Sequence, residues 1–431
     1  MKKITLFWMR RDLRLDDNTG LFYACQNEEN VLPLFIFDTD ILEELEDKKD
    51  GRVAFIHHQL QKLQEELKAQ GSSLLIKTGK PMAIFEQLVE EYPITAVYTN
   101  RDYEPYAISR DKEVDKFLHE RKIDFLDFKD QIIYEKNEIL NESGDFYKVY
   151  TPYKNAWLKK FKANAPALLE PNLKQLHQTA PFDFPTLREL GFIETDIAIP
   201  PLEINKPIIR NYDETRDFPA QDKTSHLGIH LRFGTISVRK LALEADKLNE
   251  TYLSELIWRE FFMMILFHNP HVVTESFKKK YDNIPWRNDE EEFEKWCEGN
   301  TGYPIVDAGM RELNATGHMH NRVRMITASF LTKHLLIDWR WGEAYFAKKL
   351  LDYELASNNG NWQWAAGTGT DAQPYFRIFN PASQVKKFDK DLNYIKKWVK
   401  EFGTDQYPAP MVDHKKARER ALETYKSALD K

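Results

Sequence analysis

The side chains best suited to binding or chemistry gather in residues 352–377, which read DYELASNNGNWQWAAGTGTDAQPYFR. This stretch combines two tryptophans, three asparagines, a Gly-Thr-Gly-Thr run and a Pro-Tyr-Phe-Arg end. Neither a plain amphipathic helix nor a solvated loop needs such a composition. We therefore expect a site here at which something is bound or transformed.

Two other segments place polar side chains on apolar helices. The segment ELIWREFFMMILFHNP is apolar nearly all round, which predicts a buried helix, and it carries Glu255 and Arg259 one turn apart. In HNRVRM, Asn321 and Arg324 project together from a helix whose opposite face is apolar. Buried charges need partners, so these residues either form structural ion pairs or line a cavity that binds a polar ligand.

Tryptophan is concentrated in the second half of the chain, where eight of the ten lie between Trp258 and Trp398. A helical domain commonly uses a single tryptophan as core bulk. So many in one region nevertheless favour stacking surfaces or stations for electron transfer.

Several other chemistries are not indicated. His318 and His320 are two residues apart, on different sides of a helix, and no carboxylate follows at ligand spacing, so we expect no metal site. There is no G-x-S-x-G nucleophile motif, no G-x-G-x-x-G and no GK[ST] phosphate loop. Cys25 and Cys297 lie far apart in unrelated patterns, which excludes a disulfide framework and fits a reducing compartment.

Up to residue 130 the sequence alternates β-rich runs with helical ones. The runs ITLFWM, VLPLFIF, SLLIKTG, ITAVYTN and IDFLDF are separated by segments such as residues 52–70. This alternation predicts an α/β domain with a Rossmann-like parallel sheet at residues 1–130. The cluster Arg10, Arg11, Asp12 and Arg14 follows the first run, and we interpret it as an ion-pair network that closes the strand ends.

The rest of the chain is built differently. Residues 131–210 are expected to form a long linker, because residues 164–210 hold seven of the 20 prolines and few periodic apolar stretches. Residues 211–431 predict a large all-α domain whose interior holds a cofactor or nucleotide site. Thr224 and Ser225 precede HLGIHLRFG, which predicts a helix capped by their hydroxyl groups, with backbone N–H groups suited to a phosphate.

Charge and hydropathy restrict the partners. The 431-residue chain has a net charge of −7, which argues against a protein that coats nucleic acid, although residues 386–400 carry six lysines and two aspartates. No stretch reaches the length of a membrane span, and Arg10 and Arg11 interrupt the first apolar run before it reaches signal-peptide length. We therefore expect a cytoplasmic protein without membrane contact.

Longer motifs are specific to one family. They are FWMRRDLRLDDN, YKVYTPYKNAW, RDFPAQDKTSHL, ELIWREFF, GNTGYPIVDAGMREL, GHMHNRVRMITASFLTKHLLIDWRWGEAYF and PYFRIFNPASQ. Over nearly the whole chain they resemble the photolyase and cryptochrome family, and within it the class I cyclobutane pyrimidine dimer photolyases. The resemblance implies a monomeric carbon-carbon lyase that repairs ultraviolet-damaged DNA under blue light. Photoexcited reduced FAD would donate an electron to a flipped-out pyrimidine dimer and then recover it.

The resemblance also implies the residues that hold FAD in the helical domain. They are Tyr212, Thr224, Ser225, Leu227, Arg259, Asn321, Arg324, Asp352 and Asn358. Arg324 and Asp352 would form an ion pair over the isoalloxazine ring, and Asn358 would lie beside flavin N5. The phosphate-binding motif of the family reads T-S-x-L-S, and Gly228 replaces its last serine here, so that hydroxyl contact is lost.

Catalytic roles follow from the same resemblance. Trp362, Trp339 and Trp286 match a chain that relays an electron from the surface to photoexcited FAD, with Trp286 outermost. Glu255 would bind the pyrimidine carbonyl and stabilise the radical anion. The residues that would contact the flipped lesion or its backbone are Glu255, Trp258, Arg259, Asn321, Met325, Trp364 and Gln384.

A second, light-harvesting chromophore is left open. Folate-type photolyases carry an Asn-Glu pair where this chain has Tyr106 and Ala107, after Tyr103-Glu104-Pro105. The residues of a folate-type site are thus not matched. A deazaflavin, another flavin and an empty site remain as alternatives.

Three other functions are considered. The main alternative is a cryptochrome-type blue-light photoreceptor, which binds FAD without repair activity. A photolyase for the (6-4) photoproduct would be expected to carry a histidine at or near Asn321. A dark flavin-dependent oxidoreductase would need an acid/base arrangement, of which Glu255 is the one candidate.

Overall fold

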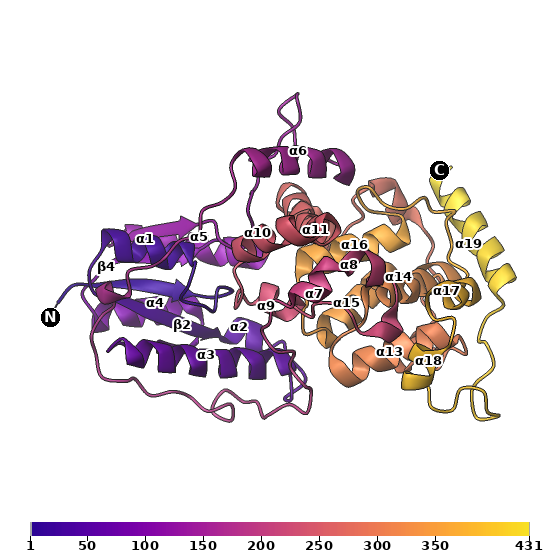
Figure 1. Cartoon of the computed structure of the whole chain (residues 1–431), viewed down its shortest axis with the longest axis horizontal. Coiled ribbons are helices and arrows are strands. Elements are labelled where there is room, and N and C mark those ends of the chain that lie inside the picture. The colour runs from indigo at the N-terminus through magenta and orange to yellow at the C-terminus, as the bar shows by residue number, and fades with distance from the viewer. Residues whose placement is uncertain (1, 431) are drawn as a thin grey trace. The chain divides into compact units, whose positions relative to one another are not determined.

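The computed structural model describes residues 2–430, which form two compact units (Figure 1). The sheet unit comprises the chain up to Glu138, Leu158–Ile204 and Leu227–Glu244; the helical unit comprises Ile139–Trp157, Asn205–His226 and the chain from Ala245 onward. Residues 131–210, expected as a linker, contain helix α6 (Tyr150–Ala163) and contribute to both units. Each unit is thus assembled from stretches that are separate in the sequence.

The sheet unit is built on five parallel strands in the order β3-β2-β1-β4-β5. The strands are β1 (Ile4–Met9), β2 (Val31–Asp38), β3 (Leu75–Gly79), β4 (Ile94–Asn100) and β5 (Asp124–Phe128). In the central strand, Thr5 pairs with Val31 on one side and with Ala96 on the other. The predicted parallel sheet and its five runs are confirmed.

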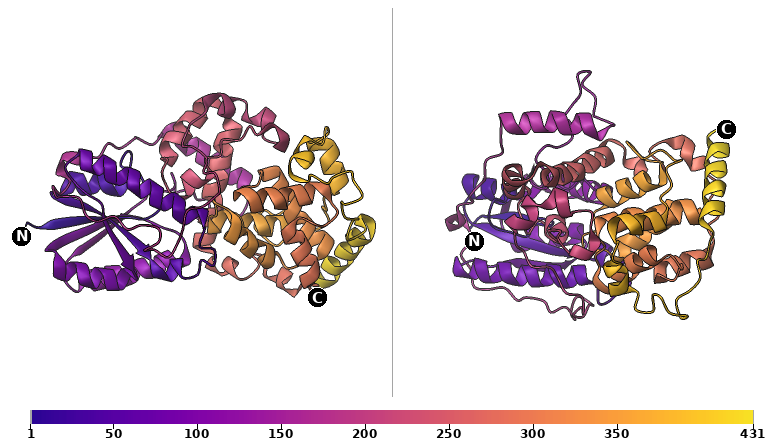
Figure 2. Two further views of the ribbon diagram at one scale, coloured as in Figure 1. Left: turned by 90° about the horizontal axis from the view of Figure 1, so that it is seen from below. Right: turned by 45° about the vertical axis from the view of Figure 1, so that its right-hand side comes forward.

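Helices lie on both faces of this sheet (Figure 2). Every residue of β1 and β2 is buried, which is why these strands read as continuous apolar runs and do not alternate. The helices of the unit are α1 (Thr19–Asn27), α2 (Thr39–Leu42), α3 (Gly51–Ala69), α4 (Pro81–Glu91), α5 (Pro105–His119) and α9 (Gly228–Arg232). Prolines in the first turn of α4 and α5 favour helix starts there.

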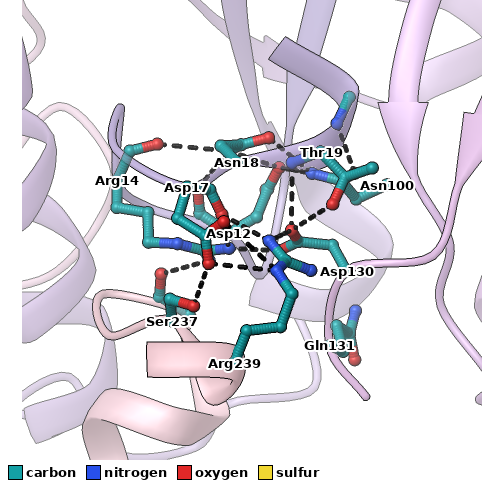
Figure 3. Close-up of polar contacts among 12 residues, drawn as sticks. Asp12, Arg14, Asp17, Asn18, Thr19, Asn100, Asp130, Gln131, Ser237 and Arg239 are labelled. Atoms are coloured by element: carbon teal, nitrogen blue, oxygen red, sulfur yellow. Dashed lines mark hydrogen bonds and ion pairs between the residues drawn. The ribbon is translucent and has the colours of Figure 1, made fainter. Parts of the chain in front are cut away.

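A buried polar network lies beyond the carboxyl ends of the strands (Figure 3). The Asp130 carboxylate accepts hydrogen bonds from Arg14 at 2.7 Å and from Arg239 at 2.9 Å. Arg239 Nε also lies 3.0 Å from Asp17 Oδ2. Burial alone would raise the pKa of Asp130, but the two guanidinium groups hold it well below its ordinary value. The network therefore ties Leu227–Glu244 to the strand ends.

The predicted ion pairs after the first strand are present. Arg10 Nη1 contacts Asp111 Oδ2 at 2.5 Å, and Arg14 pairs as described above. Asp12 is different, because it accepts hydrogen bonds from the Asn100 amide and from the Arg10 backbone N–H, both at 2.6 Å, and burial raises its pKa above the ordinary value. The cluster closes the strand ends, as expected from the sequence.

The helical unit contains most of the remaining helices. They are α7 (Lys206–Arg210), α8 (Tyr212–Thr215), α11 (Glu250–His268), α12 (Glu290–Glu298), α13 (Pro304–Thr316), α14 (Asn321–Ser329), α15 (Trp339–Lys349), α16 (Leu355–Ala366), α17 (Pro381–Phe388), α18 (Asn393–Trp398) and α19 (His414–Leu429), with α10 (Val238–Leu248) shared between the units. A π-helical turn, Phe330–Leu335, follows α14. Short 3₁₀ turns of this unit lie at Pro219–Gln221, Pro270–Val273 and Lys279–Asn283, and another, Leu173–Gln175, belongs to the sheet unit.

Helix α16 packs at close range against α11 and α15. A Cβ atom at Gly360 of α16 would collide with the Phe262 ring of α11, and one at Gly342 of α15 would collide with the Trp362 indole. Only glycine permits these approaches. The stretch that stood out in the sequence is therefore held inside the helical unit.

Among residues 2–430, no helix is both long enough and apolar enough to cross a membrane.

Candidate active site

A cavity of ≈ 90 Å³ lies beside α16. Its walls come from α14, α15, α16 and the loop between the last two. The lining residues are Asn321, Arg324, Met325, Ala328, Phe346, Leu350, Asp352, Tyr353, Glu354, Ser357, Asn358, Asn361, Trp362, Trp364 and Ala365. Seven of them are residues that the family resemblance singled out: Asn321, Arg324, Met325, Asp352, Asn358, Trp362 and Trp364.

Arg324 and Asp352 form an ion pair in the cavity wall. Arg324 Nη2 donates to Asp352 Oδ2 at 2.9 Å and to Oδ1 at 3.2 Å, while Arg324 Nε donates to the Met319 carbonyl at 2.7 Å. Burial alone would raise the pKa of Asp352, but the guanidinium holds it below its ordinary value. The expected pair is present, and its place over a flavin ring stays a prediction.

Asn358 is oriented by Glu343 of α15. Its Nδ2 donates to Glu343 Oε1 at 2.9 Å and to the Glu343 carbonyl at 3.0 Å. Burial raises the pKa of Glu343, partly offset by this bond. Because both bonds use the amide nitrogen, the Asn358 Oδ1 is left as an acceptor for a group in the cavity.

Arg259 of α11 is tied to the same wall. Its Nη2 donates to Glu354 Oε1 at 3.0 Å, and the other carboxylate oxygen of Glu354 accepts from Ser357 Oγ at 3.0 Å. Glu354 is buried, so both of its oxygens need such partners. The ion pair joins α11 to the start of α16.

Glu255, one turn before Arg259, pairs with Arg216 Nη1 rather than with Arg259. Burial raises the pKa of Glu255, and the Arg216 guanidinium opposes that rise. Arg216 Cζ also lies 5.3 Å from the centre of the Tyr212 ring. The carboxylate expected to meet the lesion is therefore held by a cation that follows α8.

Two other expected cofactor residues, Tyr212 and Ser225, contact Tyr252. The Tyr212 ring meets Tyr252 edge to face at 5.1 Å, and the Tyr252 hydroxyl donates to Ser225 Oγ at 2.9 Å. Thr224 is half-buried, and Leu227 is buried within the sheet unit. The predicted hydroxyl caps are wrong: α9 begins at Gly228, with the apolar Leu227 at the N-cap and no side-chain cap bond, and the Ser225 hydroxyl accepts from Tyr252.

Only some of the residues expected to contact the lesion line the cavity. Asn321, Met325 and Trp364 line the cavity. Trp258 of α11 stacks on Tyr150, with ring centroids 3.6 Å apart and planes inclined by 9°. Gln384 is half-buried on α17 and is not among the residues that line the cavity.

Three tryptophans were assigned to an electron relay. Trp362 lines the cavity, Trp339 is fully buried, and Trp286 is partly buried against the same core. Trp286 meets Tyr425 edge to face at 5.9 Å. Trp362 also meets Trp296 edge to face at 6.0 Å. Trp362 and Trp339 are buried and only Trp286 is partly exposed, as a relay that ends at Trp286 would require, and the relay stays a prediction.

Sequence reasoning missed three residues of the site: Arg216, Glu343 and Glu354. Each binds an expected residue that is distant in the sequence: Arg216 binds Glu255, Glu343 binds Asn358, and Glu354 binds Arg259. All three stand inside or beside quoted motifs, as in RDFPAQDKTSHL and WRWGEAYF. Their charged side chains within or beside these motifs could have indicated that they belong to the site.

The sheet unit holds the positions of a folate-type antenna site. Tyr106, at the start of α5, donates its hydroxyl to Asp38 Oδ2 at 2.6 Å, and Arg110 Cζ lies 5.6 Å from its ring. Desolvation and the Asp38 carboxylate raise the pKa of Tyr106. Ala107 is buried. These contacts leave the second chromophore open.

Within the described residues, no group of three or more His, Cys, Asp or Glu side chains could hold a metal ion. His318 instead lies 3.9 Å from Glu312 Oε1, and His320 caps α14.

Two family models match the chain: DNA photolyase over residues 5–172, and FAD binding domain of DNA photolyase over residues 252–404. The curated relatives include the deoxyribodipyrimidine photo-lyases of Halobacterium salinarum, 38% identical over 98% of this chain and 99% of that one, and of Synechococcus sp., 39% identical over 95% and 93%. The chain belongs to the DNA photolyase family. The predicted family, enzyme class and FAD cofactor are confirmed.

Solved photolyases have the same fold. A bacterial class III photolyase from Agrobacterium tumefaciens has a TM-score of 0.90, with 34% identity over 100% of this chain and 98% of that one. An archaeal photolyase from Sulfolobus tokodaii, solved with two FAD molecules, has a TM-score of 0.86, with 35% identity over 98% and 100%. A Synechocystis sp. cryptochrome has a TM-score of 0.86 over 98% of this chain and 99% of that one, but at 24% identity it shows the fold alone. The relatives' names favour repair over photoreception.

The residues that line the cavity have the chemistry that the FAD of this family needs. A flat heteroaromatic ring with polar edges needs apolar walls and a few fixed polar groups. The Trp362 indole and the Phe346 ring provide such walls, and the Arg324–Asp352 pair and the Asn358 amide provide the polar groups. The chemistry of the lining therefore agrees with the cofactor.

Proposed function

We propose that this photolyase splits cyclobutane pyrimidine dimers in DNA, driven by light, with residues 211–431 as its FAD-binding catalytic domain. The observation that carries the proposal is the fixed orientation of Asn358, whose amide nitrogen is held by Glu343 while its Oδ1 is left for the cavity. Bound reduced FAD supplies the light-absorbing group and the electron that opens the cyclobutane ring. Asn358 would offer an acceptor to the N5–H of the reduced flavin.

The other cofactor contacts are assigned as the resemblance implies. Arg324 and Asp352 would lie over the flavin ring, where the paired charges keep the wall polar without a net charge. The remaining contacts in the proposal are Tyr212, Thr224, Ser225, Leu227, Arg259 and Asn321. The Tyr252–Ser225 hydrogen bond supports a role for Ser225, since it orients that hydroxyl.

Trp362, Trp339 and Trp286 would carry an electron inward whenever the cofactor must be reduced again. Indole is readily oxidised, and a row of indoles gives the positive hole successive places to reside. The increase in exposure from Trp339 to Trp286 supports an outward direction, because water stabilises the charge at the end of the row.

The lesion would be flipped out of the duplex and bound at the cavity, at a cost of a few kcal/mol that stacking partly offsets. Trp258 and Trp364 would form its apolar walls, and Asn321, Met325, Arg259 and Gln384 would contact it or its backbone. Glu255 would hold a pyrimidine carbonyl and stabilise charge on the opened ring electrostatically. Arg216, paired with Glu255, keeps that carboxyl group in place before the lesion arrives.

The proposed enzyme is a monomer that acts on ultraviolet-damaged DNA in the cytoplasm, where a DNA-repair enzyme of this kind meets its substrate. Gel filtration of the purified protein tests the monomer.

The deciding experiment is repair of an oligonucleotide with one thymine dimer by the FAD-loaded, chemically reduced protein, with and without blue light. Restored thymines in the illuminated sample alone support the proposal. If the protein holds reduced FAD and binds the oligonucleotide but splits no dimer under light, the cryptochrome-type photoreceptor replaces it.

A further inference from the structure

Tyr150 stacks on Trp258, which lies three residues after Glu255 on α11. Their ring centroids are 3.6 Å apart, and their planes are inclined by 9°. Tyr150 is the first residue of α6 and is buried, whereas Trp258 on α11 is half-buried. One face of the indole is thus covered by a residue more than a hundred positions earlier in the chain.

Tyr150 is anchored independently of the tryptophan. Its hydroxyl donates to the Ser254 carbonyl at 2.7 Å and lies 2.6 Å from Ser254 Oγ, one turn before Trp258 on the same helix. Its backbone N–H donates to Asp371 Oδ2 at 3.0 Å, and the carbonyl of Lys148, two residues earlier, accepts from Thr370 Oγ1 at 2.6 Å. The phenol ring therefore has a fixed place relative to α11 and to the stretch that contains Trp364.

Trp258 has no such anchor of its own. Among residues 2–430, its indole has ring contacts with Tyr150, Phe261 and Phe262 but no hydrogen bond to a protein group. Phe261 and Phe262 come from the same helix and lie at 5.6 Å and 5.4 Å. The plane of the indole is therefore set mainly by the Tyr150 ring.

We propose that Tyr150 is a positioning residue for lesion binding: it fixes the Trp258 indole as a ready-made wall for the flipped pyrimidine dimer. The inference rests on the proposed function, which places Trp258 at the lesion. A wall whose side chain is already ordered loses less conformational entropy when the lesion binds. The dimer meets the part of the indole that Tyr150 leaves uncovered, since displacing Tyr150 would break its bonds to Ser254.

The test compares Tyr150→Leu, which removes the ring, with Tyr150→Phe, which keeps the ring and loses the hydroxyl. Tyr147→Leu is the matched control, because Tyr147 lies just before α6 and meets Tyr153 instead of Trp258. Dissociation constants for dimer-containing and undamaged oligonucleotides are measured in the dark by fluorescence anisotropy. The repair yield is measured at saturating DNA, and thermal melting and FAD content check the fold of each variant.

For Tyr150→Leu we expect dimer binding weaker by about three- to tenfold, with unchanged affinity for undamaged DNA and an unchanged yield at saturation. Tyr150→Phe should keep most of the parent's affinity for the dimer. In a Trp258→Ala background, adding Tyr150→Leu should weaken dimer binding little further. Dimer affinity equal to the parent in a folded Tyr150→Leu protein overturns the inference. An equal loss for both DNAs with a lowered melting temperature overturns it too, since that result shows a structural role.

A readout in the free protein separates this inference from the function itself. Tyr150→Leu should make Trp258 more accessible to acrylamide, seen as extra fluorescence quenching that is absent when Trp258 is replaced by alanine. Unchanged quenching contradicts the positioning role. Increased quenching in a protein that neither binds nor repairs dimers supports the geometry but overturns the proposed function, and the lesion-binding role with it.

Discussion

The side chain of Asn358 donates to Glu343 twice, at 2.9 Å to the carboxylate Oε1 and at 3.0 Å to the backbone carbonyl. An asparagine amide can turn over and exchange its nitrogen and oxygen. Two acceptors on the same residue favour one of these orientations. The glutamate on α15 therefore decides which atom Asn358 presents to the cavity.

Replacing Glu343 should destabilise the reduced cofactor. In Glu343→Leu the Asn358 amide loses a fixed acceptor, and we expect reoxidation of the fully reduced flavin in air to be about tenfold faster, equivalent to roughly 1.4 kcal/mol. Glu343→Gln retains an acceptor oxygen and should stay close to the parent. Reoxidation is followed in the dark by flavin absorbance, and equal rates in all three proteins would contradict the role of Glu343.

Trp286→Phe should block photoreduction of the oxidised cofactor, because phenylalanine is far harder to oxidise than indole. Repair by enzyme that has been reduced chemically should be unaffected, since that reaction needs no outside electron. Both are measured on one preparation, by flavin absorbance under light and by dimer splitting. Trp398→Phe is the control outside the proposed relay, and loss of both activities in Trp286→Phe would count against the assignment.

Glu255→Ala should lower the quantum yield of repair. The carboxyl group is proposed to stabilise charge on the dimer, and its loss should reduce the yield by about two- to tenfold. Glu255 is only half-buried, so water screens its charge and we expect a reduction near the lower end of this range. Glu250→Ala, in the first turn of the same helix, is the matched control. A yield equal to that of the parent would remove Glu255 from the mechanism.

Arg239→Leu should strongly destabilise the sheet unit. The change leaves Asp17 and Asp130 buried with one fewer cation, and breaking a buried pair in this way costs about 3–5 kcal/mol of unfolding free energy. Lys240→Leu is the matched control, because Lys240 is exposed and an exposed pair contributes at most about 1 kcal/mol. Urea unfolding of both variants measures the difference.

The same network predicts a pH dependence with a definite sign. The pKa of folded Asp130 lies below its ordinary value of 3.8, so the folded state binds fewer protons than the unfolded state in that range. The stability from this carboxylate is present above the ordinary pKa and is lost as the pH falls through the folded value. The difference in unfolding free energy between the parent and Arg239→Leu should therefore be constant near neutral pH and shrink only below about pH 4. A difference that shrinks already near neutral pH would contradict the assignment.

The five strands and the family could both be predicted from the sequence. Continuous apolar runs such as ITLFWM and VLPLFIF are strands because a sheet covered on both faces has no polar side. The motifs around Arg324, Asp352 and Asn358 marked residues that the fold brings to one cavity. Local spacing also placed Glu255 and Arg259 on one helix, although it did not show that they have different partners.

The pairs of side chains that hold one another could be seen only in the folded protein. Arg216 reaches Glu255, Glu343 reaches Asn358, and Tyr150 reaches Trp258 across gaps that no helical or strand period spans. Periodicity reports which face of an element is buried, but the partner on that face depends on how distant elements pack. For the same reason Thr224 and Ser225 resemble helix caps in sequence, yet Ser225 binds Tyr252 and the helix begins at Gly228.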